Sequence, residues 1–273
     1  MALIHCNFFS EALRMNTDIN VIIPTPHPVE NPLNPGNYFH EGAKYQTLYL
    51  LHGTYGDYTD WQRLSSIEKY AQFAKLMVVM PSGANAMYQD MIYGPQYFTY
   101  LTEELPRYVR TLFPSSEKRE DTFIGGLSMG SMGAYNAGIR RPDVYSKVIG
   151  LSGGMNFLSL NGTNAKAEGQ EDSTAPWPFK AILPPPFDGK GTGMDDEPIL
   201  REHVKNGVVL PDFYLAVGTE DFIYSLSQKT RAIMAELGLN FTYEEGPGIH
   251  DWDFWDEYIQ HAIKWLNLKN TTV

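Results

Sequence analysis

A serine flanked by two glycines is the clearest candidate for a chemically active residue in this chain. The run Gly126-Leu127-Ser128-Met129-Gly130 follows an apolar stretch and precedes residues that favour a helix. Gly-x-Ser-x-Gly is typical of a nucleophile on a sharp turn between strand and helix, where flanking side chains would clash. Backbone N–H groups at the start of that helix could stabilise an oxyanion. A structural serine in a glycine-rich turn is the alternative interpretation.

An acid and a histidine follow Ser128 in the chain order that this turn requires. Residues 212–221 form an apolar run that ends in a polar turn, which predicts Asp221 at the end of a strand. Residues 241–245 predict one more strand, and His250 follows it on a Gly-Pro-Gly loop before a predicted helix. Of the seven histidines only His250 lies on the loop between the last predicted strand and the final predicted helix, so we predict that it is the general base.

Several carboxylates compete for the role of the acid that orients His250. Glu220 and Asp221 are adjacent, and Asp251 follows the histidine directly. Asp251 is better placed to cap the helix that it precedes, since a residue next to the base rarely curls back to bond its ring. Between Glu220 and Asp221 we favour Asp221, and expect Glu220 to be a solvated turn residue.

The oxyanion would need a second N–H besides that of the residue after the nucleophile. The apolar run 47–51 leads into His52-Gly53-Thr54, and a sharp turn at Gly53 would point the Thr54 N–H towards the pocket. We therefore predict an oxyanion hole made by the N–H groups of Thr54 and Met129, with His52 bracing the loop. Trp61 follows shortly and is interpreted either as a wall of the substrate pocket or as a core residue.

The composition excludes several classes of function. A formal net charge of −11 without basic clusters argues against nucleic-acid or anionic-membrane binding. The single cysteine excludes an intrachain disulfide and a multi-cysteine zinc site, and no metal or organic cofactor is expected. No signal-peptide pattern or membrane-length apolar stretch is present, so we expect a cytoplasmic location. The composition leaves a homo-oligomer open.

Strands and helices alternate along most of the 273 residues. This alternation predicts a single α/β domain with a mostly parallel sheet, helices on both faces and an antiparallel start. Ligands bind such sheets beyond the carboxyl ends of the strands. Ser128, Asp221 and His250 are all predicted at such ends. Pro106 lies inside a helical stripe over residues 98–113 and should kink or restart that helix.

Residues 152–210 depart from the alternation, since they are rich in glycine, proline and acidic residues. Trp177, Phe179 and Phe187 lie among the prolines of this insertion. A long irregular segment in a compact domain is usually functional or mobile. We interpret it as a cap over the active site that is lined by these aromatic side chains; a surface excursion packed for stability is the alternative.

Four motifs together make the chain resemble the esterase D-like family of serine esterases, closest to its tributyrin esterase branch. They are Leu50-Leu-His-Gly53, the run 125–130, the run 217–221 and Gly248-Ile-His-Asp-Trp252. The resemblance implies an α/β-hydrolase fold and a catalytic triad of Ser128, Asp221 and His250. Ser131, where many relatives carry glycine, is a departure that the first helical turn should tolerate.

The resemblance and the motifs predict a serine carboxylesterase that works through an acyl-enzyme intermediate. Its substrates would be short-chain acyl esters, or feruloyl or acetyl esters of carbohydrate. S-formylglutathione hydrolase, which cleaves a thioester, is the alternative enzyme. A binding protein without activity would need a broken triad, and all three residue types are present.

Overall fold

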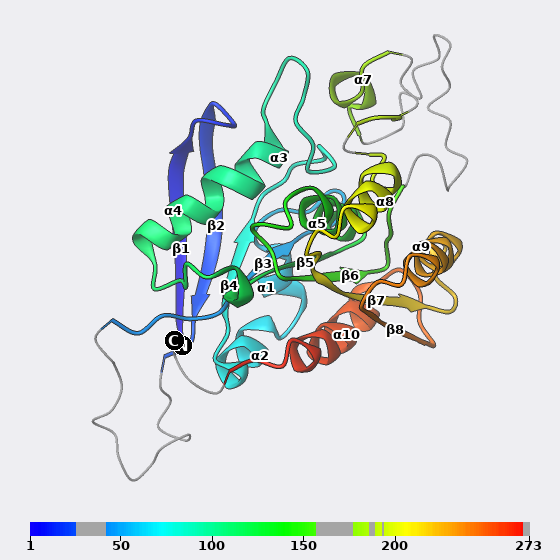
Figure 1. Cartoon of the computed structure of the whole chain (residues 1–273). Helices are drawn as coiled ribbons and strands as arrows, with labels where there is room; N and C mark the ends of the chain where they lie inside the picture. The colour runs from blue at the N-terminus through cyan, green and yellow to red at the C-terminus, as the bar shows by residue number, and fades with distance from the viewer. Residues whose placement is uncertain (26–41, 157–176, 186–188, 193, 270–273) are drawn as a thin grey trace.

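The computed structural model describes residues 1–25, 42–156, 177–185, 189–192 and 194–269. The strands of this structure form one twisted sheet (Figure 1). Across these residues the strand order is β1-β2-β4-β3-β5-β6-β7-β8. The strands are β1 (Ala2–Ser10), β2 (Met15–Ile23), β3 (Thr47–Leu51), β4 (Met77–Pro81), β5 (Thr122–Leu127), β6 (Lys147–Leu151), β7 (Asp212–Gly218) and β8 (Phe241–Gly246).

The sheet is parallel from β4 to β8 and antiparallel at its first edge. β1 pairs with β2, and β2 with β4, in antiparallel register, whereas the remaining neighbours are parallel. Every residue of β3 and β5 is buried, as expected for strands that are covered on both faces. The predicted α/β-hydrolase class and its antiparallel start are therefore confirmed.

Helices cover both faces of this sheet (Figure 1). The helical segments are α1 (Asp60–Leu64), α2 (Ile67–Ala74), α3 (Tyr97–Thr99), the π-helix η1 (Tyr100–Glu104), α4 (Leu105–Leu112), the 3-10 helix η2 (Arg119–Asp121), α5 (Met129–Arg140), α7 (Phe179–Ile182), α8 (Glu197–Lys205), α9 (Tyr224–Glu236) and α10 (Trp252–Trp265). Within the described residues, each helix is too short or too polar to span a lipid bilayer.

The period-two alternation of β3 divides the core into two layers. Leu48 and Leu50 pack in one cluster with residues of α1, α2 and α10, whereas Tyr49 and Leu51 pack in the other with α4 and α5. Because successive side chains of a strand point to opposite faces, a continuous apolar run supplies both layers. The central strands are fixed from both sides, and so are the loops at their carboxyl ends.

Two helical stretches are interrupted. α1 and α2 are separate helices, with a break at Ser65 and Ser66. The Ser65 hydroxyl bonds the Trp61 carbonyl and accepts the N–H of Ile67, which replaces helical bonds at the break. The expected kink or restart at Pro106 is confirmed: α4 begins at Leu105, directly after the π-helix η1, and the missing N–H of Pro106 interrupts the α-helical hydrogen-bond pattern at this junction.

The described part of the insertion packs against the main domain. Ile182, Leu183 and Leu200 belong to the same core cluster as α5. Asp196, just before α8, is almost fully buried. Its carboxylate accepts hydrogen bonds from Asn136 Nδ2 at 2.7 Å and from Arg140 Nε at 3.3 Å, both on α5.

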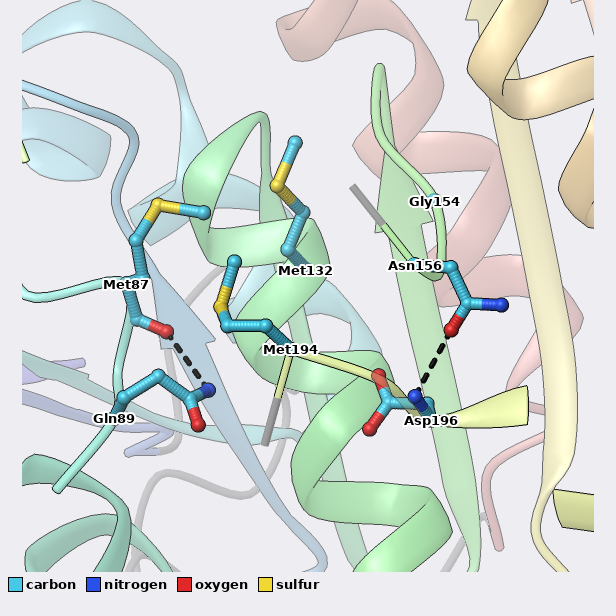
Figure 2. Close-up of a pocket in the computed structure, with 7 residues that line it drawn as sticks. All are labelled: Met87, Gln89, Met132, Gly154, Asn156, Met194 and Asp196. Carbon is cyan, nitrogen blue, oxygen red and sulfur yellow. Dashed lines mark hydrogen bonds between the residues drawn. The ribbon is translucent and has the colours of Figure 1, made fainter. Parts of the chain in front are cut away.

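Methionines from three segments meet where the insertion covers α5. The side chains of Met87, Met132 and Met194 line one small cavity (Figure 2). The cavity holds about 10 Å³, room for about one water molecule. It is lined by Met87, Gln89, Met132, Gly154, Asn156, Met194 and Asp196. A cavity of this size is too small to hold an ester substrate.

Burial has a measurable consequence for Asp196. It raises the pKa of this carboxyl to about 6, against the opposing effects of Arg140 and Asn136. Arg140 is the largest influence that opposes burial: its Nε makes a 3.3 Å bond to the carboxylate, while its Nη2 donates to the carbonyls of Thr192 and Asp195. Folding therefore favours the protonated, neutral form of the Asp196 carboxyl.

We predict that the stability of the wild type relative to Asp196→Asn falls as pH rises from 4 to 6. The pKa of Asp196 is higher in the folded state than its ordinary value near 4, so the folded protein holds this proton more tightly than the unfolded chain. The stability that results is fully present at low pH and is lost as pH rises through the folded-state pKa. The expected loss is about 2 to 3 kcal/mol. Urea unfolding of both proteins at several pH values measures it; a difference that is constant or increases with pH would contradict the burial effect.

Candidate active site

Ser128 lies on a strained turn between β5 and α5. Its φ is +52°, a left-handed conformation that is uncommon for a residue with a side chain. A Cβ at Gly126 would lie 2.6 Å from the backbone of Gly130, and one at Gly130 would lie 2.6 Å from the carbonyl oxygens of Leu51 and His52. Both contacts are with backbone, which cannot move aside. The motif therefore needs glycine at both positions, as its spacing predicted.

His250 joins Ser128 to Asp221. The ring Nε2 lies 2.9 Å from Ser128 Oγ, and Nδ1 lies 2.9 and 3.0 Å from the two oxygens of Asp221. Since a carboxylate only accepts, Nδ1 carries the proton and Nε2 is free to accept the serine hydroxyl proton. The Asp221 side chain is fully buried and that of His250 is 16% exposed, so the acid is shielded while the base is reachable.

The two neighbouring acids have separate roles in the structure. Asp221 contacts His250 and also accepts the N–H of Ile223 at 2.9 Å. Glu220 is exposed and accepts the N–H of Gly248 at 2.7 Å, which fastens the loop that carries the histidine. The structure thus brings Asp221, and not Glu220, to the base. Asp251 caps α10 by accepting the N–H of Phe254, as expected.

The charge of Asp221 is maintained by its hydrogen bonds. Burial alone would raise its pKa, but the bonds from His250 and the Ile223 N–H, together with the nearby imidazole, outweigh burial and lower the pKa. The Ser152 hydroxyl, beside the carboxylate, lowers it further. A carboxylate that stays ionised can stabilise an imidazolium as the serine proton is transferred.

Ser152 and Trp255 extend this network beyond the residues that the sequence pattern identified. Trp255 Nε1 donates to Ser152 Oγ at 3.0 Å, and its ring stands edge-on to His250 with centroids 5.0 Å apart. Ser152 is fully buried just after β6, with φ of +49°. The only sequence signal for this pair is a position at a strand end and a tryptophan five residues after His250, which is too general to assign a role.

The proposed oxyanion loop is held by His52. Its Nδ1 donates to the Gly53 carbonyl at 2.6 Å and its Nε2 accepts the Gly83 N–H at 2.8 Å. Burial lowers the pKa of His52, which favours the neutral ring that this pattern requires. The loop containing Thr54 is therefore fixed beside the nucleophile turn. Met129 is the first residue of α5, where a backbone N–H has no partner within the helix.

The predicted substrate-contacting aromatics do not share one environment. Trp61 is 1% exposed, donates its Nε1 to the Leu51 carbonyl at 2.9 Å and packs edge-on against Trp252. The interpretation of Trp61 as a wall of the substrate pocket is therefore wrong, and the structure supports the alternative that Trp61 is a core residue. The physical reason is that a buried indole finds its acceptor at the end of β3.

Trp177 and Phe179 lie close to the proposed oxyanion loop. Trp177 Nε1 donates to Thr54 Oγ1 at 3.2 Å, and its ring is 5.6 Å from that of Phe179. The Ile92 N–H donates to the Ala181 carbonyl at 2.7 Å, which fastens α7 to the loop before α3. Phe187, the third aromatic predicted for the cap, lies outside the described residues.

Comparison with known proteins agrees with this geometry. The family described as "Putative esterase" matches residues 14–266. The chain belongs to this esterase family. An acetyl esterase of Caldicellulosiruptor saccharolyticus is 30% identical over 273 residues, which cover 98% of this chain and 98% of that protein.

Solved structures give the same result. The serine hydrolase FphF of Staphylococcus aureus, described as fluorophosphonate-binding, has a TM-score of 0.84 at 30% identity, covering 98% of this chain and 99% of its own. S-formylglutathione hydrolase FrmB of the same species has a TM-score of 0.79 at 30% identity, covering 97% and 98%. The chain is therefore a carboxylic ester hydrolase, and the predicted relation to the esterase D-like family is confirmed.

Removal of the Ser152 hydroxyl should make the ionised form of Asp221 less stable. We predict that Ser152→Ala lowers kcat roughly tenfold with little change in KM, because a hydrogen bond to a charged group contributes about 1.5 kcal/mol or more. Loss of activity that comes from protonation of Asp221 should begin at higher pH, since Asp221 would become easier to protonate without this hydroxyl. Steady-state kinetics across pH measure both effects.

Ser227→Ala is the matched control for this substitution. Ser227 is also fully buried and donates to the Gly153 carbonyl at 2.8 Å, but it does not contact the acid or the base in the described structure. If Ser152→Ala and Ser227→Ala change the rate equally and leave the same pH profile, Ser152 has only a structural role.

Proposed function

We propose that this esterase is a serine carboxylesterase in which Ser128 is the nucleophile and His250 the general base. The observation that carries the proposal is the continuous contact from Asp221 through His250 to Ser128, with both ring nitrogens within 3.0 Å of their partners. A serine hydroxyl is a weak nucleophile until an adjacent base accepts its proton, and the base needs a third group to orient it.

Acylation starts when Ser128 Oγ attacks the ester carbonyl carbon while His250 Nε2 takes the hydroxyl proton. Asp221 stabilises the resulting imidazolium. The negative charge on the carbonyl oxygen would be bound by the N–H groups of Thr54 and Met129. The C–O bond then breaks, and the imidazolium gives its proton to the departing alcohol. An acyl group remains on Ser128.

Deacylation uses the same groups with water as the nucleophile. His250 removes a proton from the water as it attacks the acyl carbon, and returns that proton to Ser128 Oγ as the acid leaves. The glycine-flanked turn holds the serine in place through both steps, so little reorganisation is required. These steps need neither a metal nor an organic cofactor.

Short acyl esters, with acetyl or feruloyl esters of carbohydrate, are the proposed substrates. The full-length likeness to a protein named acetyl esterase supports a small acyl group. The likeness to FrmB, named S-formylglutathione hydrolase, supports the thioester alternative. One purified sample assayed with p-nitrophenyl acyl esters, methyl ferulate, acetylated xylan and S-formylglutathione discriminates between them; faster thioester turnover would favour the alternative.

We predict that Ser128→Ala lowers ester hydrolysis at least about a thousandfold without loss of the fold, because only oxyanion binding remains to accelerate the reaction. A fluorophosphonate probe should label the wild type and leave Ser128→Ala unlabelled. Ser225→Ala, which changes an exposed serine on α9, is the control and should keep both activity and labelling. Near-normal turnover by folded Ser128→Ala would refute the nucleophile.

Residues of the insertion should select the acyl group. Trp177 bonds Thr54, so it lies on the side of the site where the carbonyl oxygen would bind. We predict that Trp177→Ala changes the ranking of acetyl, butyryl and feruloyl esters by a factor of about ten, the typical value of an apolar pocket contact. Specificity constants and a melting curve measure this. A common fall for all three esters, with a lower Tm, would indicate a structural role alone.

A further inference from the structure

An exposed aromatic ring lies directly against the catalytic histidine. Phe222 is 77% exposed, yet its ring centroid is 4.4 Å from that of His250, with the planes inclined by 47°. Scattered exposed apolar residues are ordinary on protein surfaces. This one differs because it contacts the base on one side and leaves most of its surface open beside the reacting atoms.

The position of Phe222 is fixed by the turn that also holds the acid. The Asp221 N–H donates to the Gly218 carbonyl, and the Tyr224 N–H donates to the Asp221 carbonyl. The Asp221 carboxylate accepts the N–H of Ile223, whose side chain is buried. Burial of the residues on both sides directs Phe222 outward. The Phe222 ring is thus held in position before a ligand binds, which lowers the entropy cost of binding.

The chemistry of ester cleavage decides which part of the substrate meets this ring. The carbonyl oxygen lies towards Thr54 and Met129 in the proposed mechanism, whereas the leaving oxygen must reach His250 Nε2 to receive a proton. The alcohol part of the ester therefore lies beside His250 and its neighbour Phe222.

We propose that Phe222 is a binding platform for the alcohol part of the substrate, and that this alcohol contains a ring. A flat, fixed aromatic face binds either an aryl group or the C–H face of a sugar, and both present a ring of similar size. The inference rests on the proposed function, since it assumes that His250 protonates the leaving group. In this proposal two different residues select the two parts of the ester: Phe222 selects the alcohol part, and Trp177 selects the acyl part.

The test keeps the acyl group constant and varies the alcohol. Ethyl acetate, phenyl acetate and a fully acetylated monosaccharide are assayed with the wild type, Phe222→Ala, Phe222→Leu and Phe73→Ala. For each ester the ratio of variant to wild-type kcat/KM removes the intrinsic reactivity of the leaving group. Phe73, exposed on α2, is the control for loss of a surface phenylalanine and should leave all ratios near one.

We expect Phe222→Ala to lower kcat/KM roughly tenfold for at least one ring acetate, while ethyl acetate changes less than about twofold. Loss for phenyl acetate alone identifies an aryl ester, and loss for the sugar acetate alone a carbohydrate ester. Phe222→Leu should restore little of the loss, because it keeps apolar cover over His250 but removes the flat face.

An equal fall for all three acetates in Phe222→Ala, restored by leucine, would overturn the platform and show that Phe222 only shields His250 from water. That outcome is distinct from failure of the proposed function. If Ser128 is labelled and required for turnover, the esterase mechanism holds whatever Phe222 does; if Ser128→Ala remains active, the mechanism itself fails.

Discussion

The close approach of the nucleophile turn to the loop after β3 is the constraint on which the site depends. At Gly126 and Gly130 the backbones leave no space for a Cβ, so the turn can pack against Leu51 and His52 only with glycine. The same contact brings the first N–H of α5 beside the loop of Thr54. Ser128, at φ of +52°, is the strained residue that this packing holds in place.

The parallel sheet gathers the other groups at the same edge. Ser128 follows β5, Ser152 follows β6, Asp221 follows β7 and His250 follows β8. Because neighbouring parallel strands end side by side, residues far apart in sequence meet there without a long connecting structure. The acid is deepest and the base partly exposed, an order that keeps the charge of Asp221 away from water while substrate reaches His250.

Different segments lie beside the base and beside the proposed oxyanion loop. Phe222 belongs to the turn that is held by the carboxylate and the backbone of Asp221. Trp177 donates to Thr54, and the Ala181 carbonyl of α7 accepts the N–H of Ile92. The described part of the insertion also packs on the core cluster that contains α5, so it is held by apolar contacts as well as by hydrogen bonds.

Local rules made much of this protein predictable from its sequence. The glycine spacing around Ser128, the alternation of apolar runs, the strand ends before Asp221 and His250, and the cap at Asp251 each reflect a constraint within a few residues. Only the tertiary structure decided what depends on distant partners. Trp61 is a core residue because the Leu51 carbonyl accepts its indole N–H, and Ser152 meets Trp255 across 103 residues of sequence. Tertiary packing brings these groups together, and no pattern of neighbouring residues in the sequence predicts such contacts.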